Sequence, residues 1–451
     1  MTITMDNLNK LEQAALKIFL AGVQAADPEL AVKKYLTRRD KQLSIGLSNG
    51  ENRQKNWSKV HLIAFGKAAC GMAKAAQEIL TSEPNLMSES GLVVTNYQNV
   101  KDIPNCEVFG AQHPTPDLNG YQAAQQIAKR AQAAQQGELV LVLISGGGSA
   151  LIPYPPDSIS LEDKITTTQL LLGCGANINQ INVVRKHLSQ LKGGGLTRLA
   201  TPADLHALVL SDVIGDELTA IASGTTVPDS TTYDDAIQVL KPVWQQVPLK
   251  VRQHLEAGKR GEIPETPKEQ DPIFANSDYT IIGSNRISVN ALIEEAKKQG
   301  FTPCLYQDEL TGEANQVAQD LVEFALQQER KTPLAILAGG ETTVTLNQNP
   351  GLGGRNQEMS LALAIAAQQK GLTGKWVFLS GGTDGRDGPT DAAGGIVTPT
   401  TLARIANAQN YLNNHDAYHA LQQADALLQI GATGTNVADL QVFLLSPSSE
   451  D

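Results

Sequence analysis

Two serines and three glycines directly follow an apolar segment of the chain. Leu139–Ile144 is apolar throughout, which is typical of a strand buried on both faces of a sheet. Glycines at the carboxyl end of such a strand leave backbone N–H groups accessible to an anion, and hydroxyl groups add further hydrogen-bonding capacity. We therefore predict an anion site formed by Ser145, Gly146, Gly147, Gly148 and Ser149.

Three other apolar segments also end in glycine-containing turns. They are Val60–Lys67, Leu334–Thr343 and Trp376–Gly385. Ligands of open α/β sheets bind at the carboxyl ends of the strands. We therefore expect the four turns to lie on one functional face.

Lys67 lies at the start of a predicted helix over residues 68–80. The helix dipole opposes a cation in the first turn unless an anion binds there. One interpretation is a group that binds phosphate or stabilises a transition state. The other is an ordinary solvated lysine, and the spacing favours neither. The surrounding residues do not form a P-loop, and the chain has no G-x-G-x-x-G motif, so no Rossmann dinucleotide site is predicted.

Arg185, Ser189 and Lys192 are spaced so that they share one face of a helix. Basic side chains gathered within an acidic protein favour a second anion site, in which Arg185 and Lys192 bind the ligand. The alternative is a solvated helix face that ends at Gly193–Gly195.

Asp212 and Asp216 follow another apolar segment, Leu208–Leu210. Two carboxylates at the end of a strand suit a magnesium ion that keeps several of its waters, and they also suit a general base. For Asp216 there is a second interpretation, as the cap of the next helix.

The C-terminal half contains a further group of charged residues. Arg355 follows two glycines at the start of a predicted helix, where its guanidinium can bind a carboxylate or phosphate through two hydrogen bonds. Asp384, Asp387 and Asp391 lie close together, but their spacing does not fit an EF-hand calcium loop. A magnesium–nucleotide loop is the favoured interpretation, and a tight structural turn is the alternative.

The elements that position these residues are predicted to alternate between short apolar strands and Ala- and Gln-rich helices from Val60 onward. This rhythm is typical of an α/β fold with a mostly parallel sheet between helices. A chain of 451 residues is too long for one core, so we expect two domains. An amphipathic helix is predicted over residues 8–26. The proline-rich segment 247–273 is interpreted as a linker or surface excursion, which places the domain junction near residues 245–275.

The composition argues against several functional classes. A net charge of −11 provides no basic excess for nucleic acid. No apolar run is long enough to span a membrane, and Met1–Asn7 lacks the features of a signal peptide. The four cysteines are scattered, as expected in a reducing compartment. We therefore expect a cytoplasmic protein with small-molecule ligands and no nucleic-acid or membrane partner. Its oligomeric state is left open by the sequence, and a homodimer is one candidate.

Taken together, these stretches resemble the class II glycerate kinases, the glycerate 2-kinase family whose C-terminal half is called the MOFRL domain. In the first half of the chain the motifs are Ala64–Ala68, His113–Asp117, Ser145–Leu151, Val184–Ser189 with Lys192–Gly194, and Ser211–Asp216. In the second half they are Gly339–Thr343, Gly353–Glu358, Gly385–Gly394 and Thr433–Val437. The motifs occur in the expected order and span most of the chain.

The resemblance implies ATP-dependent phosphorylation of D-glycerate at its 2-hydroxyl, with ATP and Mg²⁺ as cofactors. It also implies two α/β domains, each with a mostly parallel sheet flanked by helices. These are a Rossmann-like N-terminal domain over residues 1–250 and a MOFRL-type C-terminal domain over residues 275–451, with the active site in the cleft between them.

The resemblance further implies roles for individual residues. Lys67 and Arg355 occupy the positions of a lysine and an arginine that are regarded as catalytic in the family. Phosphate or the glycerate carboxylate is expected to bind Ser145–Ser149, Arg185, Lys192, Glu341 and Asn356. The candidates for the Mg²⁺ ligands are Asp212, Asp216, Asp384 and Asp387, and Asp212 is also a candidate for the catalytic base.

Two other functions compete with this one. A hydroxypyruvate reductase would need a nicotinamide site for NAD(P)H, and the missing G-x-G-x-x-G motif argues against it. A non-catalytic regulator would bind ATP or glycerate without turnover, but that task requires fewer charged groups at strand ends than this chain contains.

Overall fold

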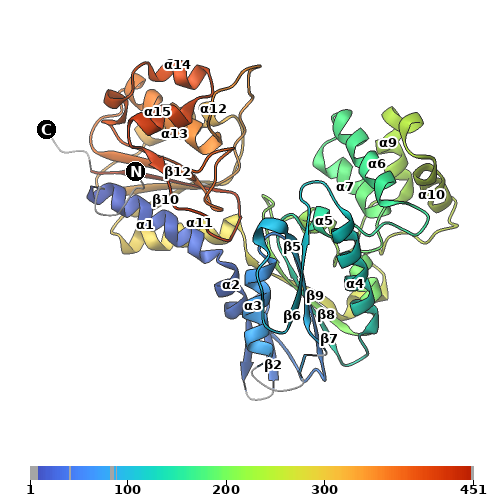
Figure 1. The fold of residues 1–451 in the computed structure, drawn as a ribbon. Helices are drawn as coiled ribbons and strands as arrows, with labels where there is room; N and C mark the ends of the chain where they lie inside the picture. Colours follow the sequence, from blue (N-terminus) through green and yellow to red (C-terminus); the bar gives the residue numbers. More distant parts are fainter. Residues whose placement is uncertain (1–8, 40–41, 82–85, 88, 448–451) are drawn as a thin grey trace. The chain divides into compact units, whose positions relative to one another are not determined.

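The computed structural model describes residues 9–39, 42–81, 86–87 and 89–447 (Figure 1). The chain divides into two compact units. The central unit is Pro28–Ile282, and the terminal unit combines Met1–Asp27 with Gly283–Asp451. Each unit has its own sheet and its own apolar core.

The central unit is built on a six-stranded sheet with the strand order β6-β5-β4-β7-β8-β9. The strands are β4 (Val60–Phe65), β5 (Gly91–Asn96), β6 (Cys106–Ala111), β7 (Leu139–Ile144), β8 (Asp204–Leu210) and β9 (Ser277–Gly283). The pairs from β6 to β8 are all parallel. The strand order reverses between β4 and β7, so their carboxyl ends form the topological switch point at which open α/β sheets bind ligands.

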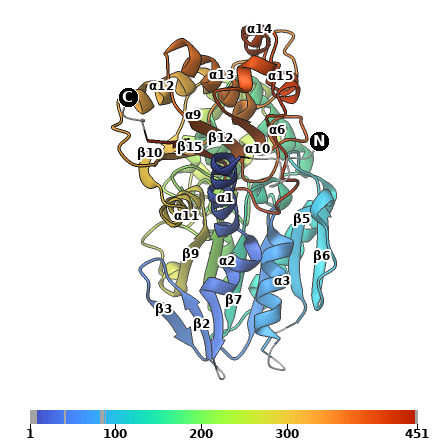
Figure 2. The same ribbon diagram turned by 90° about the vertical axis from the view of Figure 1, so that its left-hand side faces the viewer.

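Helices cover both faces of this sheet, because its central strands are apolar on both sides. α3 (Ala69–Leu80) and α4 (Leu118–Ala133) lie on opposite sides (Figure 1). α2 (Pro28–Tyr35) packs beside α3 (Figure 2). The shorter elements of this part are β1 (Leu36–Arg39), β2 (Gln42–Gly46), β3 (Asn52–Lys55), η2 (Tyr97–Asn99), α5 (Gly148–Leu151), α8 (Gly195–Ala200), η3 (Ile221–Ser223) and η5 (Pro272–Asn276). β1, β2 and β3 form a small antiparallel sheet.

A second group of helices in the central unit has a separate apolar core. Its members are α6 (Leu161–Gly173), α7 (Ile178–His187), α9 (Tyr233–Leu240), η4 (Lys241–Gln246) and α10 (Leu249–Lys259). Val251 and Leu255 of α10 are fully buried in that core. The interpretation of residues 247–273 as a linker is therefore wrong, because the segment contains a packed helix and its prolines lie outside that helix.

The terminal unit is built on a six-stranded mixed sheet with the strand order β10-β11-β15-β12-β13-β14. The strands are β10 (Thr302–Leu310), β11 (Leu334–Gly340), β12 (Trp376–Gly382), β13 (Gly394–Val397), β14 (Leu427–Leu428) and β15 (Asp439–Leu445). β10 and β11 are parallel, and the other pairs are antiparallel.

Two layers of helices enclose the mixed sheet (Figure 1). On one face α1 (Lys10–Ala25) packs beside α11 (Asn285–Lys298). On the other face lie α12 (Ala314–Leu326), α13 (Arg355–Gln369), η6 (Thr401–Arg404), α14 (Ala408–Asn413) and α15 (Ala417–Gln423). α13 is buried along most of its length.

The two-domain α/β architecture is confirmed, with two differences from the prediction. The second sheet is mixed rather than mostly parallel, because β15 lies between β11 and β12 and runs antiparallel to both. The domain bounds 1–250 and 275–451 also differ from the observed units. The apolar face of α1 is buried in the terminal unit, whereas β9 completes the sheet of the central unit. The predicted cleft between the domains stays a prediction.

We predict that Phe19→Ala destabilises the terminal unit by about 3–5 kcal/mol, because Phe19 of α1 is fully buried in its core. The effect is measured as the difference in the free energy of unfolding in urea between Phe19→Ala and the wild type. Lys17→Ala, at an exposed position of the same helix, is the control and should leave stability unchanged. Equal stability of the two variants would contradict the observed packing of α1.

Candidate functional site

The turns that follow β4 and β7 hydrogen-bond to each other. The N–H of Lys67 donates to the carbonyl oxygen of Gly146 at 2.8 Å, and the N–H of Ala68 donates to Ser145 Oγ at 3.0 Å. Gly66 has a φ of 124°, and a Cβ there would overlap Ser145. Ser145 is 1% exposed. Its hydroxyl therefore fixes the Lys67 turn, and its predicted role as an anion ligand gains no support from this placement.

The side chain of Lys67 lies beside Gly147 and the ring of His113. Asp212 is also close: a Cβ on Gly146 would overlap its carboxylate. Burial raises the pKa of Asp212, and the charge of Lys67 partly opposes that rise. Burial and the same charge lower the pKa of His113. No acidic side chain of the described residues lies within ion-pair distance of Lys67, so its ammonium is available to an anion.

His113 is a site residue that the sequence analysis did not single out. Its motif, His113–Asp117, contributed to the family resemblance, but nothing in the spacing connected it with Lys67. Because it lies between β6 and α4, only the folded sheet brings it to the turn after β7.

Ser149 belongs to a chain of three polar side chains. Ser149 Oγ lies 2.8 Å from Ser223 Oγ, and Ser223 donates to Asn182 Oδ1 at 3.1 Å. Ser223 therefore accepts from Ser149. Ala222 and Ser223 both have positive φ values, 50° and 56°, which is rare for residues other than glycine. This backbone conformation places the Ser223 hydroxyl between Ser149 and α7.

Three cations lie close together at the C-terminal end of α7. They are Lys164, Arg185 and Lys192. The ammonium of Lys164 donates to the carbonyl oxygen of Leu188 at 2.7 Å, and burial together with Arg185 lowers the pKa of Lys164 to about 7. Lys192 is 1% exposed and its Nζ has no hydrogen-bond partner, and burial lowers its pKa well below the usual value.

The structure thus brings the predicted pair Arg185 and Lys192 together and adds Lys164. Burial lowers the pKa of Arg185 as well, and none of the described acidic residues forms an ion pair with it. Grouped cations without a counter-ion are stabilised by a bound anion. The solvated-face alternative is wrong for Lys192, which is buried. Lys164 gave no sequence signal, because it is one of several polar residues in α6.

Asp216 lies in the loop after β8, four residues beyond Asp212, with a φ of 55°. Its alternative role as a helix cap is wrong, since the next helical element in the described chain, η3, has Ala220 at its N-cap position. No group of three or more His, Cys, Asp or Glu side chains suited to a metal ion occurs among the described residues. Mg²⁺ needs only one or two protein carboxylates when substrate phosphates complete its coordination, so Asp212 and Asp216 fit such an ion by residue type.

In the terminal unit Arg355 is held by two carboxylates. Its Nε and Nη2 donate to the two oxygens of Asp439 at 2.5 and 3.0 Å, and its Nη1 lies 2.9 Å from Glu341 Oε1. Asp439 is fully buried, and its hydrogen bond and charge raise the pKa of Arg355 above the usual value of an arginine. Glu341 was predicted to bind substrate, whereas here it pairs with the arginine. Asp439 was missed because it lies 84 residues from Arg355 in sequence.

Asp387 and Asn356 are also occupied within the protein. Asp387 accepts the backbone N–H groups of Asn356 and Gln357 at 3.2 and 2.8 Å, and it thereby caps α13. Burial and Asp439 raise its pKa to about 7. Asn356 is 1% exposed and accepts from Ser380 Oγ at 2.6 Å. These contacts favour structural roles over the predicted metal-binding and substrate-binding roles.

The fourth predicted metal ligand, Asp384, accepts the N–H of Arg386 at 2.9 Å. This short-range bond is the one expected of a tight structural turn, which was the alternative interpretation of the loop.

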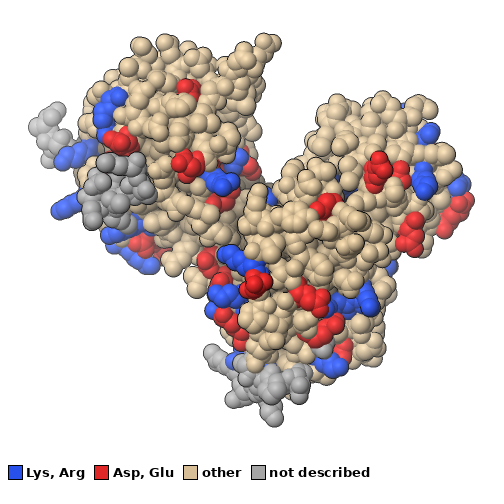
Figure 3. All heavy atoms as spheres, in the orientation of Figure 1, with Lys and Arg blue, Asp and Glu red and all other residues tan. Residues whose placement is uncertain are grey.

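Figure 3 shows acidic and basic side chains interspersed on the visible face, with no continuous basic area. Among the described residues, no helix is both long and apolar enough to cross a membrane.

We predict that stability of the central unit rises between pH 7 and pH 10 through Lys164. Its pKa is lowered to about 7 in the folded state, so the unfolded chain binds more protons across this range. Lys164→Met should flatten the dependence of the unfolding free energy on pH. Lys250→Met, at an exposed position of α10, is the control. An unchanged slope in Lys164→Met would show that Lys164 is not buried as described.

Comparison with protein families identifies both halves of the chain. Residues 14–256 match a domain of unknown function, DUF4147, and residues 334–439 match the MOFRL family.

Individual relatives match over nearly the full length. The chain is 38% identical to a protein of Pyrococcus horikoshii named glycerate 2-kinase, with 98% of each chain covered. It is 36% identical to an Agrobacterium vitis protein provisionally named a hydroxypyruvate reductase, over 96% of this chain and 94% of that one. A crystal structure of a glycerate kinase from Thermotoga maritima superimposes with a TM-score of 0.85 at 36% identity, over 96% of this chain and 99% of that one. The chain therefore belongs to the MOFRL family of glycerate 2-kinases.

Proposed function

We propose that this protein transfers the γ-phosphoryl group of ATP to the 2-hydroxyl of D-glycerate. The observation that carries the proposal is that Lys67 and Asp212 both lie beside the glycine turn after β7, at the switch point of the sheet. This site combines an ammonium with no described acidic partner and a carboxylate whose pKa is raised. The names of the relatives from Pyrococcus and Thermotoga support the choice of glycerate as acceptor.

The chemistry requires positioning and charge stabilisation rather than a covalent enzyme intermediate. The glycerate 2-oxygen forms a bond to the γ-phosphorus while the bond from that phosphorus to the β–γ bridging oxygen breaks. The hydroxyl proton passes to the carboxylate of Asp212, whose raised pKa suits a general base. Lys67 stabilises the charge on the transferring group.

The other groups of the central unit have supporting roles in this proposal. Arg185 and Lys192 bind a further anionic group, either the remaining phosphates or the glycerate carboxylate. The N–H groups of Gly147 and Gly148 lie in the turn after β7, and Gly147 lies beside Lys67. When bound, Mg²⁺ would supply neutralisation of the phosphate charge, and Asp216, in the loop after β8, is the residue that would hold it while Asp212 takes the proton.

In the terminal unit Arg355 is proposed to bind an anionic oxygen of the reactants. Asp439 and Glu341 fix the orientation of its guanidinium, so Asp439 is a positioning residue in this scheme. Asp387 fixes the start of α13, the helix from which Arg355 projects.

A second candidate function is reduction of hydroxypyruvate with NAD(P)H, which the name of the Agrobacterium vitis relative favours. Incubation with hydroxypyruvate and NADH or NADPH tests it by the absorbance of the nicotinamide. Oxidation of either nucleotide at a catalytic rate would support this function in place of the kinase.

The proposed reaction is tested with purified protein, ATP, Mg²⁺ and D-glycerate, coupled to enolase without phosphoglycerate mutase. Enolase accepts only the 2-phosphate, so a signal is expected without mutase. A signal that requires mutase would overturn the 2-position. No signal in either assay would exclude glycerate as the acceptor.

We predict that Lys67→Ala lowers kcat about 10²-fold or more with little change in the KM for D-glycerate, because the contact forms mainly in the transition state. The coupled assay measures both constants. Lys59→Ala, at an exposed position just before β4, is the matched control and should retain full activity. A change confined to KM would show that Lys67 only binds substrate.

We also predict that Asp439→Asn lowers kcat by about 10-fold or more, because the two hydrogen bonds to Arg355 lose their charge. Glu341→Gln should have a smaller effect, since Glu341 is 45% exposed, whereas Asp439 is fully buried. Kinetics are compared at a temperature at which both variants are folded by circular dichroism. The reverse order of effects would rule out Asp439 as the principal positioning residue.

A further inference from the structure

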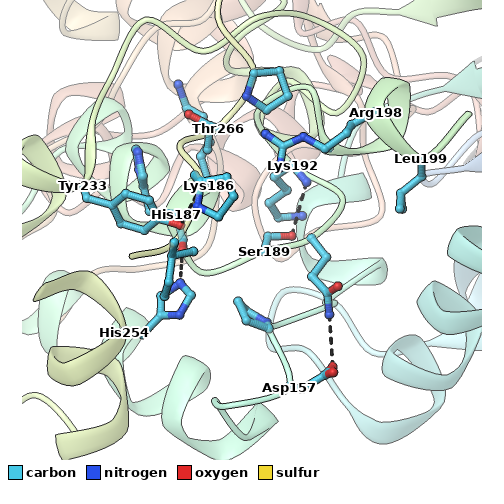
Figure 4. Close-up of a pocket in the computed structure, with 16 residues that line it drawn as sticks. Asp157, Lys186, His187, Ser189, Lys192, Arg198, Leu199, Tyr233, His254 and Thr266 are labelled. Atoms are coloured by element: carbon cyan, nitrogen blue, oxygen red, sulfur yellow. Dashed lines mark hydrogen bonds between the residues drawn. The ribbon is translucent and has the colours of Figure 1, made fainter. Parts of the chain in front are cut away.

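The central unit contains a cavity of about 280 Å³ beside α7 (Figure 4). Tyr233, His187 and His254 lie on one side of it, and Lys192 and Arg198 lie on the other. The cavity therefore has an aromatic side and a cationic side. Neither the Lys67 turn nor the Asp212 loop contributes to its lining.

Three buried polar atoms of the lining residues have no hydrogen-bond partner. His187 Nε2 is one of them, and it lies 3.3 Å from Glu265 Oε2. The other two face no acidic side chain among the described residues. One is the ammonium nitrogen of Lys192, a donor. The other is His254 Nδ1, which acts as an acceptor because Nε2 of that ring donates to the carbonyl oxygen of His187 at 3.1 Å. Buried polar atoms are normally satisfied. A ligand that offers an anionic oxygen at one end and an N–H donor at the other would satisfy Lys192 Nζ and His254 Nδ1.

The other charged groups around the cavity already have partners. Lys186 pairs with Asp229 at 2.8 Å. Glu265 accepts the N–H of Tyr233 at 2.9 Å and lies 3.3 Å from His187 Nε2. Arg198 donates to the carbonyl oxygen of Glu265. Asp157 lies within 3.4 Å of Gln190 Nε2. Lys192 is therefore the buried cation of this lining that still needs an anion.

The aromatic side is suited to a flat ring. The rings of His187 and His254 pack edge-on against Tyr233, with centroids 4.8 and 5.7 Å from it. Leu199 and Pro267 add apolar surface. A cavity of this size is large enough for a purine and too small for a complete nucleoside triphosphate.

Hydrogen bonds through the segment Ser223–Gly224 connect the cavity with the turn after β7. The N–H groups of Gly193 and Gly194, next to Lys192, donate to the carbonyl oxygens of Ser223 and Gly224 at 3.1 and 2.8 Å. Ser223 in turn accepts from Ser149. A ligand with an extended phosphate chain can therefore have its ring in the cavity and its phosphates directed toward the glycine turn.

We propose that this cavity binds the purine of the adenine nucleotide, with His254 Nδ1 accepting a hydrogen bond from the exocyclic amine and Lys192 binding a phosphate. This assignment rests on the proposed use of ATP and specifies where the nucleotide binds. Lys192 lines the cavity and also lies close to Lys164 and Arg185, so a phosphate bound to Lys192 would lie near all three cations.

The test is ADP binding to the full-length protein, measured by titration calorimetry, together with the KM values for ATP and D-glycerate. Leu199→Trp fills the cavity without altering the unpaired polar atoms. We expect it to weaken ADP binding by about tenfold or more and to raise the KM for ATP, with the KM for D-glycerate unchanged. Leu172→Trp, at a position that is 61% exposed on α6, is the control.

A second variant keeps the test informative if Leu199→Trp does not fold. Lys192→Met should weaken ADP binding and raise the melting temperature of the nucleotide-free protein, because it removes a buried cation without a partner.

Unchanged ADP affinity in a folded Leu199→Trp variant, or an altered KM for D-glycerate alone, would overturn the proposal. So would the absence of ADP binding to the wild type. If ADP binds and Leu199→Trp abolishes binding while glycerate is not phosphorylated, the cavity assignment stands and only the proposed acceptor fails.

Discussion

The close approach of the backbone after β4 to the backbone after β7 is the constraint on which the central unit depends. Gly66 and Gly146 permit it, because a Cβ at either position would overlap Ser145 or Asp212. The resulting hydrogen bonds involve the main chain around Lys67 and leave its ammonium without an acidic partner among the described residues. A cation positioned in this way retains its full charge for a ligand, which a cation positioned by a salt bridge does not.

The terminal unit positions its cation by the opposite means. Arg355 is fixed by two carboxylates, and the buried one, Asp439, lies at the start of the strand between β11 and β12. Asp387 then anchors the beginning of α13 through two backbone N–H groups. Asp439, Glu341 and Asp387 therefore orient Arg355 and its helix, while Asp212 of the central unit lies near a lysine that has no acidic partner among the described residues. This difference follows from the packing around each group and not from the residue types, which are similar.

Much of the arrangement could be predicted from sequence because it is local. Continuous apolar segments indicated β4, β7, β11 and β12, and the glycines after them indicated turns at the ends of these strands. Arg185 and Lys192 do lie close together, but the shared helix face predicted for them is wrong, because α7 ends at His187, before Ser189 and Lys192. What failed was the direction of individual side chains. Ser145, Asn356 and Asp387 have the residue types of ligands, yet each makes internal hydrogen bonds. Lys164, His113 and Asp439 were missed because their partners are distant in the chain, and the antiparallel direction of β15 leaves no mark on apolar periodicity.

The position of β15 has a consequence for how the chain folds during synthesis. α1 is the first helix described and β15 is the last strand, and the two pack against each other in the terminal unit. The contacts that close this unit have very large sequence separation, which slows folding. The central unit is continuous in sequence, so it can fold on the ribosome while the apolar face of α1 still lacks its partners. α1 emerges before the central unit and is thus among the last of the described helices to be covered, so a chaperone that binds amphipathic helices would find its target in residues 10–25.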